Sequence, residues 1–349
     1  MSEEPDVIVR KEGRAGRLTL NRPRALHALT TAMCQAMTQA LLDWRSDPGV
    51  ELVILDHTGE RGFCAGGDIR MLAESGAGDG RLAREFFFVE YRLNHLLFTY
   101  PKPVVALTDG VTMGGGVGIS LPSRYRVATE RTTFAMPETG IGLFPDVGGG
   151  WYLPRLPGSA GRWLGLTGER IKGPDCRALG IATHYVESAR LEDLKAALAR
   201  DGAPESALPG FVSDPGPAPI EAVRPDIDRL FAGSSVEMIF AALEAEASDW
   251  AAGELAKLRT KSPQALKVTF HQLELGAVMP SFAETMAMEY RIASRVVRRH
   301  DFIEGVRAVI VDKDNAPRWR PRQLEGVSEG LLDEIFAPLP VGEAWTPIP

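Results

Sequence analysis

The most informative stretch of this 349-residue chain is MPETGIGLFPDVGGG, residues 136–150. Two carboxylates, Glu138 and Asp146, stand eight residues apart in an otherwise apolar, glycine-rich segment. A buried carboxylate without partners is costly, so such groups usually carry hydrogen bonds, raised pKa values or chemistry. Two glycine turns lie upstream, at residues 65–68 (AGGD) and 113–116 (MGGG). Turns that expose backbone N–H groups near carboxylates are what acyl chemistry on a carbonyl group requires.

Composition and charge exclude several classes of protein. Hydrophobic residues make up 44% and charged residues 24%, which is ordinary for a soluble globular enzyme. The net charge of −7 is spread along the chain and argues against nucleic acid or an anionic membrane as a partner. No apolar run approaches the roughly 18 residues of a membrane span. The acidic start lacks the features of a secretory signal or a transit peptide, so we expect a cytoplasmic protein.

Metal and disulfide chemistry are also not indicated. The three cysteines form neither a metal-like pair nor an even disulfide framework: Cys34, Cys64 and Cys176. The six histidines are scattered and show no metal-ligand spacing. No Gly-x-Ser-x-Gly elbow announces a serine nucleophile. The sequence therefore predicts no metal site.

The apolar pattern predicts an α/β first half and a helical second half. A hairpin is expected within residues 6–20, and a helix that starts at Thr30 or Thr31 follows it. Short apolar runs predict buried strands at 52–55, 103–107, 125–129 and 133–136. Residues 203–225 are rich in proline and glycine and indicate a surface connection. Helical periodicity then dominates at 236–243, 251–258, 264–275 and 283–297, before a loose tail at 338–349. We expect an α/β core that holds the site (1–200) and a C-terminal helical region (201–349).

In their order along the chain these motifs resemble the crotonase (enoyl-CoA hydratase/isomerase) superfamily. The resemblance is carried by residues 63–70 (FCAGGDIR), 112–118 (TMGGGVG), 136–150, and later motifs at 152–156, 166–168, 180–184, 262–263 and 301–308. More narrowly, Phe144-Pro145-Asp146 and the late motifs resemble the branch that hydrolyses 3-hydroxyisobutyryl-CoA. The resemblance implies a ββα spiral core with a C-terminal helical layer. It also implies an acyl-CoA substrate and no cofactor, since coenzyme A is part of the substrate.

The resemblance assigns the glycine turns to the thioester. It makes the backbone N–H groups of Ala65 and Gly115 the donors of an oxyanion hole, and it places Gly66, Gly67 and Asp68 beside the bound CoA. For the first turn the alternative is a tight turn with Asp68 as a helix cap. For the second turn it is a packed glycine turn between strand and helix. A dinucleotide-binding fingerprint does not fit, because no suitable acidic residue ends the next strand.

The residue at position 118 bears on the type of reaction. Hydratases of the superfamily place a glutamate there, which works with a second glutamate twenty residues later; this chain has Gly118 and Glu138. Asp146 stands where hydratases commonly have glycine. Half of the pair for hydration is missing, which favours the hydrolase branch. Glu138 would then deprotonate water or attack the thioester carbon, and Asp146 would bind the substrate hydroxyl and orient water. The alternative for Glu138 is a loop carboxylate that caps a backbone N–H, and the alternative for Asp146 is a helix cap.

Glu90 is a further candidate for the substrate pocket. On the helix expected over 82–97 it falls at the edge of an apolar stripe. Residues 90–94 also reproduce a Glu-Tyr-x-Leu-Asn pattern of the hydrolase branch. The alternative is an exposed partner of Arg84 or Arg92. Lys267 and Arg307 could meet CoA phosphates, although a lone basic residue on a helix usually faces water.

The sequence therefore predicts a thioesterase that hydrolyses 3-hydroxyisobutyryl-CoA, or a similar short hydroxyacyl-CoA, in valine breakdown. One alternative is a lyase or isomerase that acts on enoyl-CoA, against which Gly118 speaks. Another is a non-catalytic acyl-CoA-binding relative, against which the intact pair of Glu138 and Asp146 speaks. The oligomeric state stays open: superfamily members often form trimers, and here the C-terminal helices could instead cover that surface.

Overall fold

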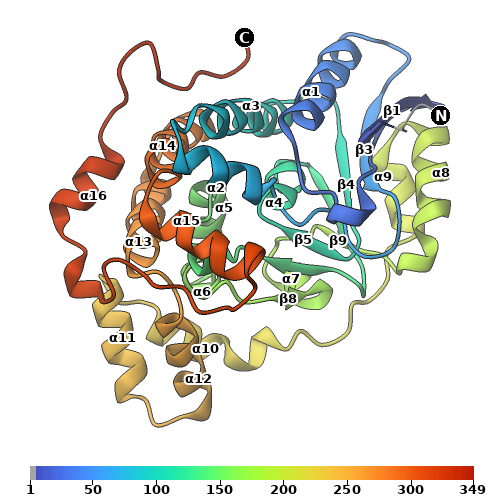
Figure 1. Cartoon of the computed structure of the whole chain (residues 1–349). Helices are drawn as coiled ribbons and strands as arrows, with labels where there is room; N and C mark the ends of the chain where they lie inside the picture. Colours follow the sequence, from blue (N-terminus) through green and yellow to red (C-terminus); the bar gives the residue numbers. More distant parts are fainter. Residues whose placement is uncertain (1–4) are drawn as a thin grey trace.

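The structure is a computed structural model that describes residues 5–349. Its strands form two sheets (Figure 1): a six-stranded sheet of order β1-β2-β3-β4-β6-β9 and a three-stranded sheet of order β5-β7-β8. The β1–β2 and β7–β8 pairs are antiparallel, and the other pairs run parallel. The strands are β1 Val7–Glu12, β2 Ala15–Leu20, β3 Leu52–His57, β4 Val104–Thr108, β5 Val111–Met113, β6 Tyr125–Ala128, β7 Thr133–Ala135, β8 Ile171–Lys172 and β9 His184–Tyr185.

The centre of the large sheet is covered on both faces. Val53 and Leu55 of β3 pack in one core cluster with helices α1 (Thr31–Arg45) and α3 (Arg81–Phe98). Leu52 and Ile54 face the other way and pack against α8 (Leu191–Asp201). Parallel strands buried on both faces are apolar along their whole length. This explains the short apolar runs, and the strands expected at 52–55, 103–107, 125–129 and 133–136 are confirmed.

Local signals also fix where the site helices begin. Thr30 caps α1, and its hydroxyl accepts a hydrogen bond from the Met33 N–H at 3.2 Å. Asp68 caps α2 (Ile69–Ala77), and its carboxylate accepts from the Met71 N–H at 3.3 Å. The short α4 (Gly115–Ser120) follows the second glycine turn and is fully buried.

The two glycine turns lie against one another. Cys64 and Thr112 form an isolated parallel bridge, and a Cβ at Gly116 would lie 2.4 Å from the Cys64 carbonyl oxygen. Only glycine allows so close an approach. The glycine at position 116 therefore brings residues 63–67 and 113–116 to one place in the fold.

The second half is helical, as expected. Three short helices lie before it, in the first 200 residues: α5 Gly149–Tyr152, α6 Ala160–Thr167 and α7 Gly173–Ala178. Its own helices are α9 Pro204–Ala207, α10 Ile220–Leu230, α11 Val236–Ala245, α12 Asp249–Arg259, α13 Pro263–Val278, α14 Phe282–Val296, α15 His300–Val306, a π-helical turn at Arg307–Val311, and α16 Glu329–Phe336. α13 packs on α5, α14 packs on α3, and α15 packs on α2, so the C-terminal layer touches the elements that carry the site (Figure 1). No helix within residues 5–349 combines the length and apolar character needed to cross a membrane.

Two local expectations for the second half hold only in part, since residues 211–219 and 338–349 do lack helices and strands. The surface connection expected over 203–225 contains α9 and the start of α10, which packs against α6 and α7 despite Pro225. The buried Asp175 carboxylate accepts from the Ile220 N–H at 2.9 Å and fixes the start of that helix. The tail after residue 338 is anchored as well, because the buried Trp345 indole N–H donates to the Phe88 carbonyl at 3.3 Å. In both places contacts distant in sequence override the local signal.

Candidate active site

A cavity of about 480 Å³ lies between the core and the C-terminal layer. Both glycine turns contribute to its wall, together with α2, α3, the loop after β7 and the segment after α15. Among the residues predicted for the site, those that line it are Ala65, Gly66, Gly67, Glu90, Gly115, Glu138 and Asp146. Seven separate stretches of the sequence therefore meet in one cavity, and four of them carry residues predicted for the site.

The Gly115 N–H is free to bind a ligand. Gly115 is the first residue of α4, so its N–H has no acceptor within the helix. No hydrogen bond to another described residue occupies it. A helix start of this kind, at the wall of the cavity, suits an oxygen that gains negative charge.

The structure differs from expectation at Ala65. Its N–H donates to the Leu26 carbonyl at 2.9 Å, so it is already occupied. The carbonyl oxygen of a substrate would have to share or displace that bond. By contrast, no described residue accepts from the N–H of the neighbouring Gly66. The donor role of Ala65 therefore stays a prediction, whereas Gly115 is ready without rearrangement.

Glu138 follows β7 on a 3-10 turn and is buried. Its Oε2 has no hydrogen-bond partner among the described residues. A Cβ at Gly114 would lie 3.3 Å from its Oε1, which places the carboxylate beside the second glycine turn. Burial and the nearby Asp146 carboxylate raise the pKa of Glu138 well above its ordinary value.

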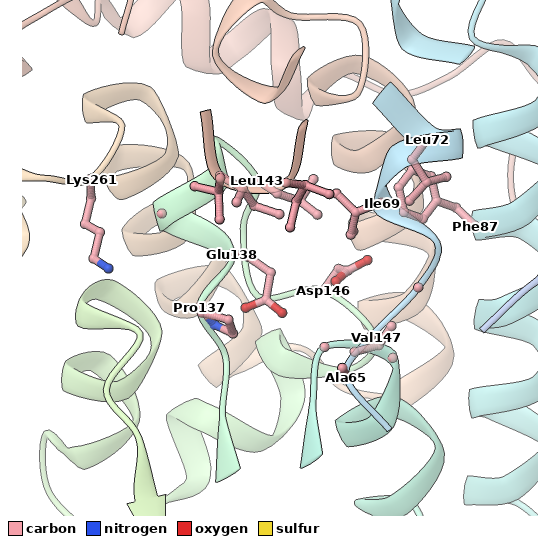
Figure 2. A pocket seen from close by; sticks show the side chains of 18 of the residues that line it. Ala65, Ile69, Leu72, Phe87, Pro137, Glu138, Leu143, Asp146, Val147 and Lys261 are labelled. Atoms are coloured by element: carbon pink, nitrogen blue, oxygen red, sulfur yellow. The ribbon is translucent and has the colours of Figure 1, made fainter. Parts of the chain in front are cut away.

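Asp146 projects into the same space as Glu138 (Figure 2). It is buried, and its Oδ2 accepts a hydrogen bond from the Tyr91 hydroxyl at 2.7 Å. Burial raises the pKa of Asp146 to about 6, and the bond from Tyr91 acts against that rise. Asp146 is thus the carboxyl of the cavity whose charged form a hydrogen bond from the protein favours.

Glu90 is the third carboxyl of the cavity. It is only 1% exposed, which excludes the exposed ion pair with Arg84 or Arg92. Its Oε1 has no partner among the described residues and would lie 2.6 Å from a Cβ at Gly115. Burial, and then the Asp146 charge, raise the pKa of Glu90 well above its ordinary value.

These three carboxyls share one cavity. Within residues 5–349 none of them forms an ion pair with lysine or arginine. Carboxyls in such a setting share protons, so that one can act as a base while another stays neutral and donates. Among the same residues no group of His, Cys, Asp and Glu is arranged to hold a metal ion. The geometry suits proton transfer at a carbonyl group.

Asp68 has a structural position. It is not part of the cavity wall, caps α2, and lies 3.7 Å from Arg22 across an ion pair. Asp68 is therefore a helix cap, which was the alternative considered for it in the sequence, and a role for Asp68 in binding substrate stays a prediction. Gly66 and Gly67 do line the cavity.

The basic residues that line the cavity were not anticipated. Lys267 pairs with Glu237 at 2.7 Å, Arg307 is held by three carboxylates, and neither lines the cavity. Lys261 and Arg170 do line it instead. Lys261 is half-buried, and no described residue accepts a hydrogen bond from its amine (Figure 2). Its place directly before the Ser-Pro motif at 262–263 was the only signal in the sequence.

Comparison with known families and proteins agrees with this architecture. The family model described as enoyl-CoA hydratase/isomerase matches residues 15–336. A protein of Danio rerio named 3-hydroxyisobutyryl-CoA hydrolase, mitochondrial, is 46% identical over 96% of this chain and 90% of its own length. The Homo sapiens protein of the same name is 42% identical over 96% and 89%. Those names place the relatives in mitochondria, and the cytoplasmic location expected for this chain stays a prediction.

Two solved structures share the whole fold. One is described as a carnitinyl-CoA dehydratase from Mycobacterium thermoresistibile, with a TM-score of 0.93, 41% identity, and coverage of 96% of this chain and 97% of the other. Another is described as an enoyl-CoA hydratase from Rhodobacter sphaeroides 2.4.1, with a TM-score of 0.92, 44% identity, and coverage of 98% and 100%. The predicted fold, an α/β core of the crotonase type with a C-terminal helical layer, is confirmed.

Proposed function

Because this chain belongs to the enoyl-CoA hydratase/isomerase (crotonase) family, we propose that it hydrolyses the thioester of 3-hydroxyisobutyryl-CoA, or of a similar short hydroxyacyl-CoA, to the free acid and CoA. The observation that carries the proposal is the meeting of Glu138 and Asp146 in one cavity beside the free Gly115 N–H. The names of relatives that share 41–46% of this sequence over nearly its whole length support the substrate.

In the proposed reaction the thioester oxygen accepts a hydrogen bond from the Gly115 N–H. As the carbonyl carbon becomes tetrahedral, negative charge grows on that oxygen, and one such donor is worth ~2.7–4 kcal/mol. The Ala65 N–H would join as a second donor once its bond to the Leu26 carbonyl is exchanged for one to the substrate.

Glu138 acts either as the base that accepts a proton from water or as the nucleophile that accepts the acyl group. As a base, its carboxylate takes a proton from water while the water oxygen attacks the thioester carbon. The C–S bond then breaks, and the CoA thiolate takes that proton. As a nucleophile, it attacks the carbon directly, CoA leaves, and water hydrolyses the mixed anhydride. The unpartnered Oε2 of Glu138 suits either route, since no protein donor competes for it.

Asp146 and Glu90 would determine which acyl chains the site accepts. The Asp146 carboxylate, held by Tyr91, accepts a hydrogen bond from the hydroxyl of the acyl chain. Neutral Glu90 can donate a hydrogen bond beside Gly115, where the thioester oxygen gains negative charge, and its carbonyl oxygen can accept one from the attacking water. A site built to bind a hydroxyl rejects an analogue without one, because its own polar groups are left unpaired.

The second candidate is addition of water to an enoyl-CoA, as the descriptions of the two solved structures suggest. Glu90 is the observation that favours it, because it supplies a second carboxyl to the cavity. Position 118 speaks against it: a Cβ there would lie 2.5 Å from the Val147 Cβ and 3.0 Å from the Asn94 Nδ2. The space that a hydratase glutamate would need is filled by Val147 and Asn94.

One pair of assays separates the two candidates. Release of free thiol is measured with 3-hydroxyisobutyryl-CoA, 3-hydroxypropionyl-CoA and isobutyryl-CoA, and loss of the conjugated double bond is measured with crotonyl-CoA. We expect thiol release from the hydroxyacyl esters to be far faster than hydration. Efficient hydration of crotonyl-CoA without thiol release would reject the hydrolase and establish the lyase.

A further inference from the structure

The turn that carries Asp146 has an unfavourable backbone conformation. Val147 has a φ of +53°, and Gly148 follows with +96°. A β-branched residue with positive φ is a genuine outlier, and such conformations cost of order 1–3 kcal/mol. They persist only where surrounding structure enforces them. The turn from Pro145 to Gly150 must therefore be held from outside.

Two buried side chains of the C-terminal layer hold it. Glu289 of α14 accepts from the Gly148 N–H at 2.7 Å and from the Gly150 N–H at 2.8 Å. Gln272 of α13 donates its amide to the Pro145 carbonyl at 2.7 Å and to Glu289 at 3.0 Å. Hydrogen bonds thus grip the backbone on both sides of the Asp146–Val147 pair. We call this group, Gln272 and Glu289, the clamp.

The glycines of this region leave room for the clamp. A Cβ at Gly150 would lie 3.0 Å from both the Gln272 amide and the Glu289 carboxylate. A Cβ at Gly276 of α13 would lie 1.9 Å from the Gly150 carbonyl oxygen. Any larger residue at position 276 would push α13, and Gln272 with it, away from the turn.

The helix that carries Glu289, α14, also contacts Tyr91, whose hydroxyl binds Asp146. Glu289 is followed by Tyr290, whose ring meets the Tyr91 ring edge-on at 6.5 Å between centroids. Tyr91 in turn donates to Asp146. One turn of α14 therefore supports both the backbone of the Asp146 turn and the side chain that orients its carboxylate.

We propose that Gln272 and Glu289 are positioning residues for thioester hydrolysis, which act by fixing the Asp146 turn so that its carboxylate faces the substrate hydroxyl. This inference rests on the proposed function. Burial raises the pKa of Glu289 to about 8, and the hydrogen bonds from its donors act against that rise, so the charged carboxylate is kept here at a cost in stability.

The test is a double-mutant cycle with thiol release from 3-hydroxyisobutyryl-CoA as the readout. Glu289→Gln places an amide N–H₂ among three donors and should lower kcat by about 10–100-fold, with KM changed less than threefold. In the double variant, Glu289→Gln should lower kcat by no more than about threefold relative to Asp146→Asn alone, because the carboxylate that Glu289 positions is already absent. Gln272→Leu, which removes the donor to Pro145, should behave in the same way if Glu289→Gln does not fold.

Asp175→Asn is the matched control. Asp175 is also a buried carboxylate that accepts two backbone N–H groups, from Ile220 at 2.9 Å and from Lys172 at 3.3 Å, but it lies outside the cavity. Its replacement should lower stability and leave kcat unchanged. Losses that multiply in the Glu289–Asp146 double variant, or a normal kcat in folded Glu289→Gln, would overturn the proposal. Absence of thiol release from the wild-type chain would reject the proposed function instead.

Discussion

Replacement of Asp146 by asparagine should make the protein more stable at pH 8 while it impairs catalysis. Burial raises the pKa of Asp146 from 3.8 to about 6, so the folded chain holds this proton more tightly than the unfolded chain does. Below pH 3.8 both states are protonated and the group costs nothing. As pH rises through 6 the folded chain loses the proton, and the whole penalty is present.

The size of the gain follows from that shift. About two pKa units at ~1.36 kcal/mol each give an upper limit of ~3 kcal/mol at pH 8. Asparagine keeps an acceptor for the Tyr91 hydroxyl and removes the charge that raises the pKa of Glu90 and Glu138. We therefore expect a gain of about 1–3 kcal/mol, or roughly 2–4 °C in melting temperature for a chain of this length.

Thermal unfolding of wild type and variant at pH 8 and pH 5 measures this gain, which should fall by about half at pH 5. Thiol release gives the catalytic side: the loss with 3-hydroxyisobutyryl-CoA should exceed that with isobutyryl-CoA at least about tenfold, the value of a lost charged hydrogen bond. The Asp175→Asn control should be less stable than wild type at pH 8. A less stable Asp146→Asn protein, or a gain independent of pH, would refute the reasoning. Equal losses on both substrates would assign Asp146 to the chemical step.

Three further predictions concern the rest of the cavity. Glu138→Gln should lower kcat by about 10²–10⁴-fold and leave acyl-CoA binding, measured by calorimetry, largely intact, because the amide keeps the shape and loses the basicity; turnover within threefold of wild type would remove Glu138 from the mechanism. Lys261→Met should raise KM for the CoA ester about tenfold and leave KM for the N-acetylcysteamine thioester unchanged. The reason is that the second ester lacks the phosphates that a free ammonium would meet. An equal change in KM for both esters, or a change in KM in the exposed Lys172→Met control, would contradict this. Gly118→Glu should destabilise the fold by about 1–3 kcal/mol without creating crotonyl-CoA hydration, since its Cβ would clash with Val147; a stable variant that hydrates crotonyl-CoA would show that the space exists.

Much of the fold could be predicted because its signals are local. Strand β3 is apolar along its length, and α1 begins at a threonine that caps it. The glycine turns and the stretch 136–150 also contain half of the residues that line the cavity. In these places a pattern of a few residues is enough to predict which segments are buried in the structure.

Other features depend on contacts that leave no local trace. The hydrogen bond from Tyr91 to Asp146 joins residues 55 positions apart, and the one from Gly148 to Glu289 joins residues 141 apart. The occupied N–H of Ala65 depends on the carbonyl of Leu26 in another loop. Glu289 did have one signal: it lies on the buried face of α14, beside Met286 and Ala293. An acidic side chain on an apolar helix face has to find partners, and a search for such residues would have identified it.

The clamp has a consequence for the order in which the protein is made. Glu289 follows Gly150 by 139 residues, so a ribosome that adds about 5–20 residues per second delivers it roughly 7–30 s later. Throughout that interval the nascent chain already contains both glycine turns, Glu138 and Asp146, but the clamp is incomplete until Glu289 is added. Catalytic competence should therefore arrive late in synthesis and in one step. A chain that ends before α14 would carry the carboxylates of the cavity and remain inactive.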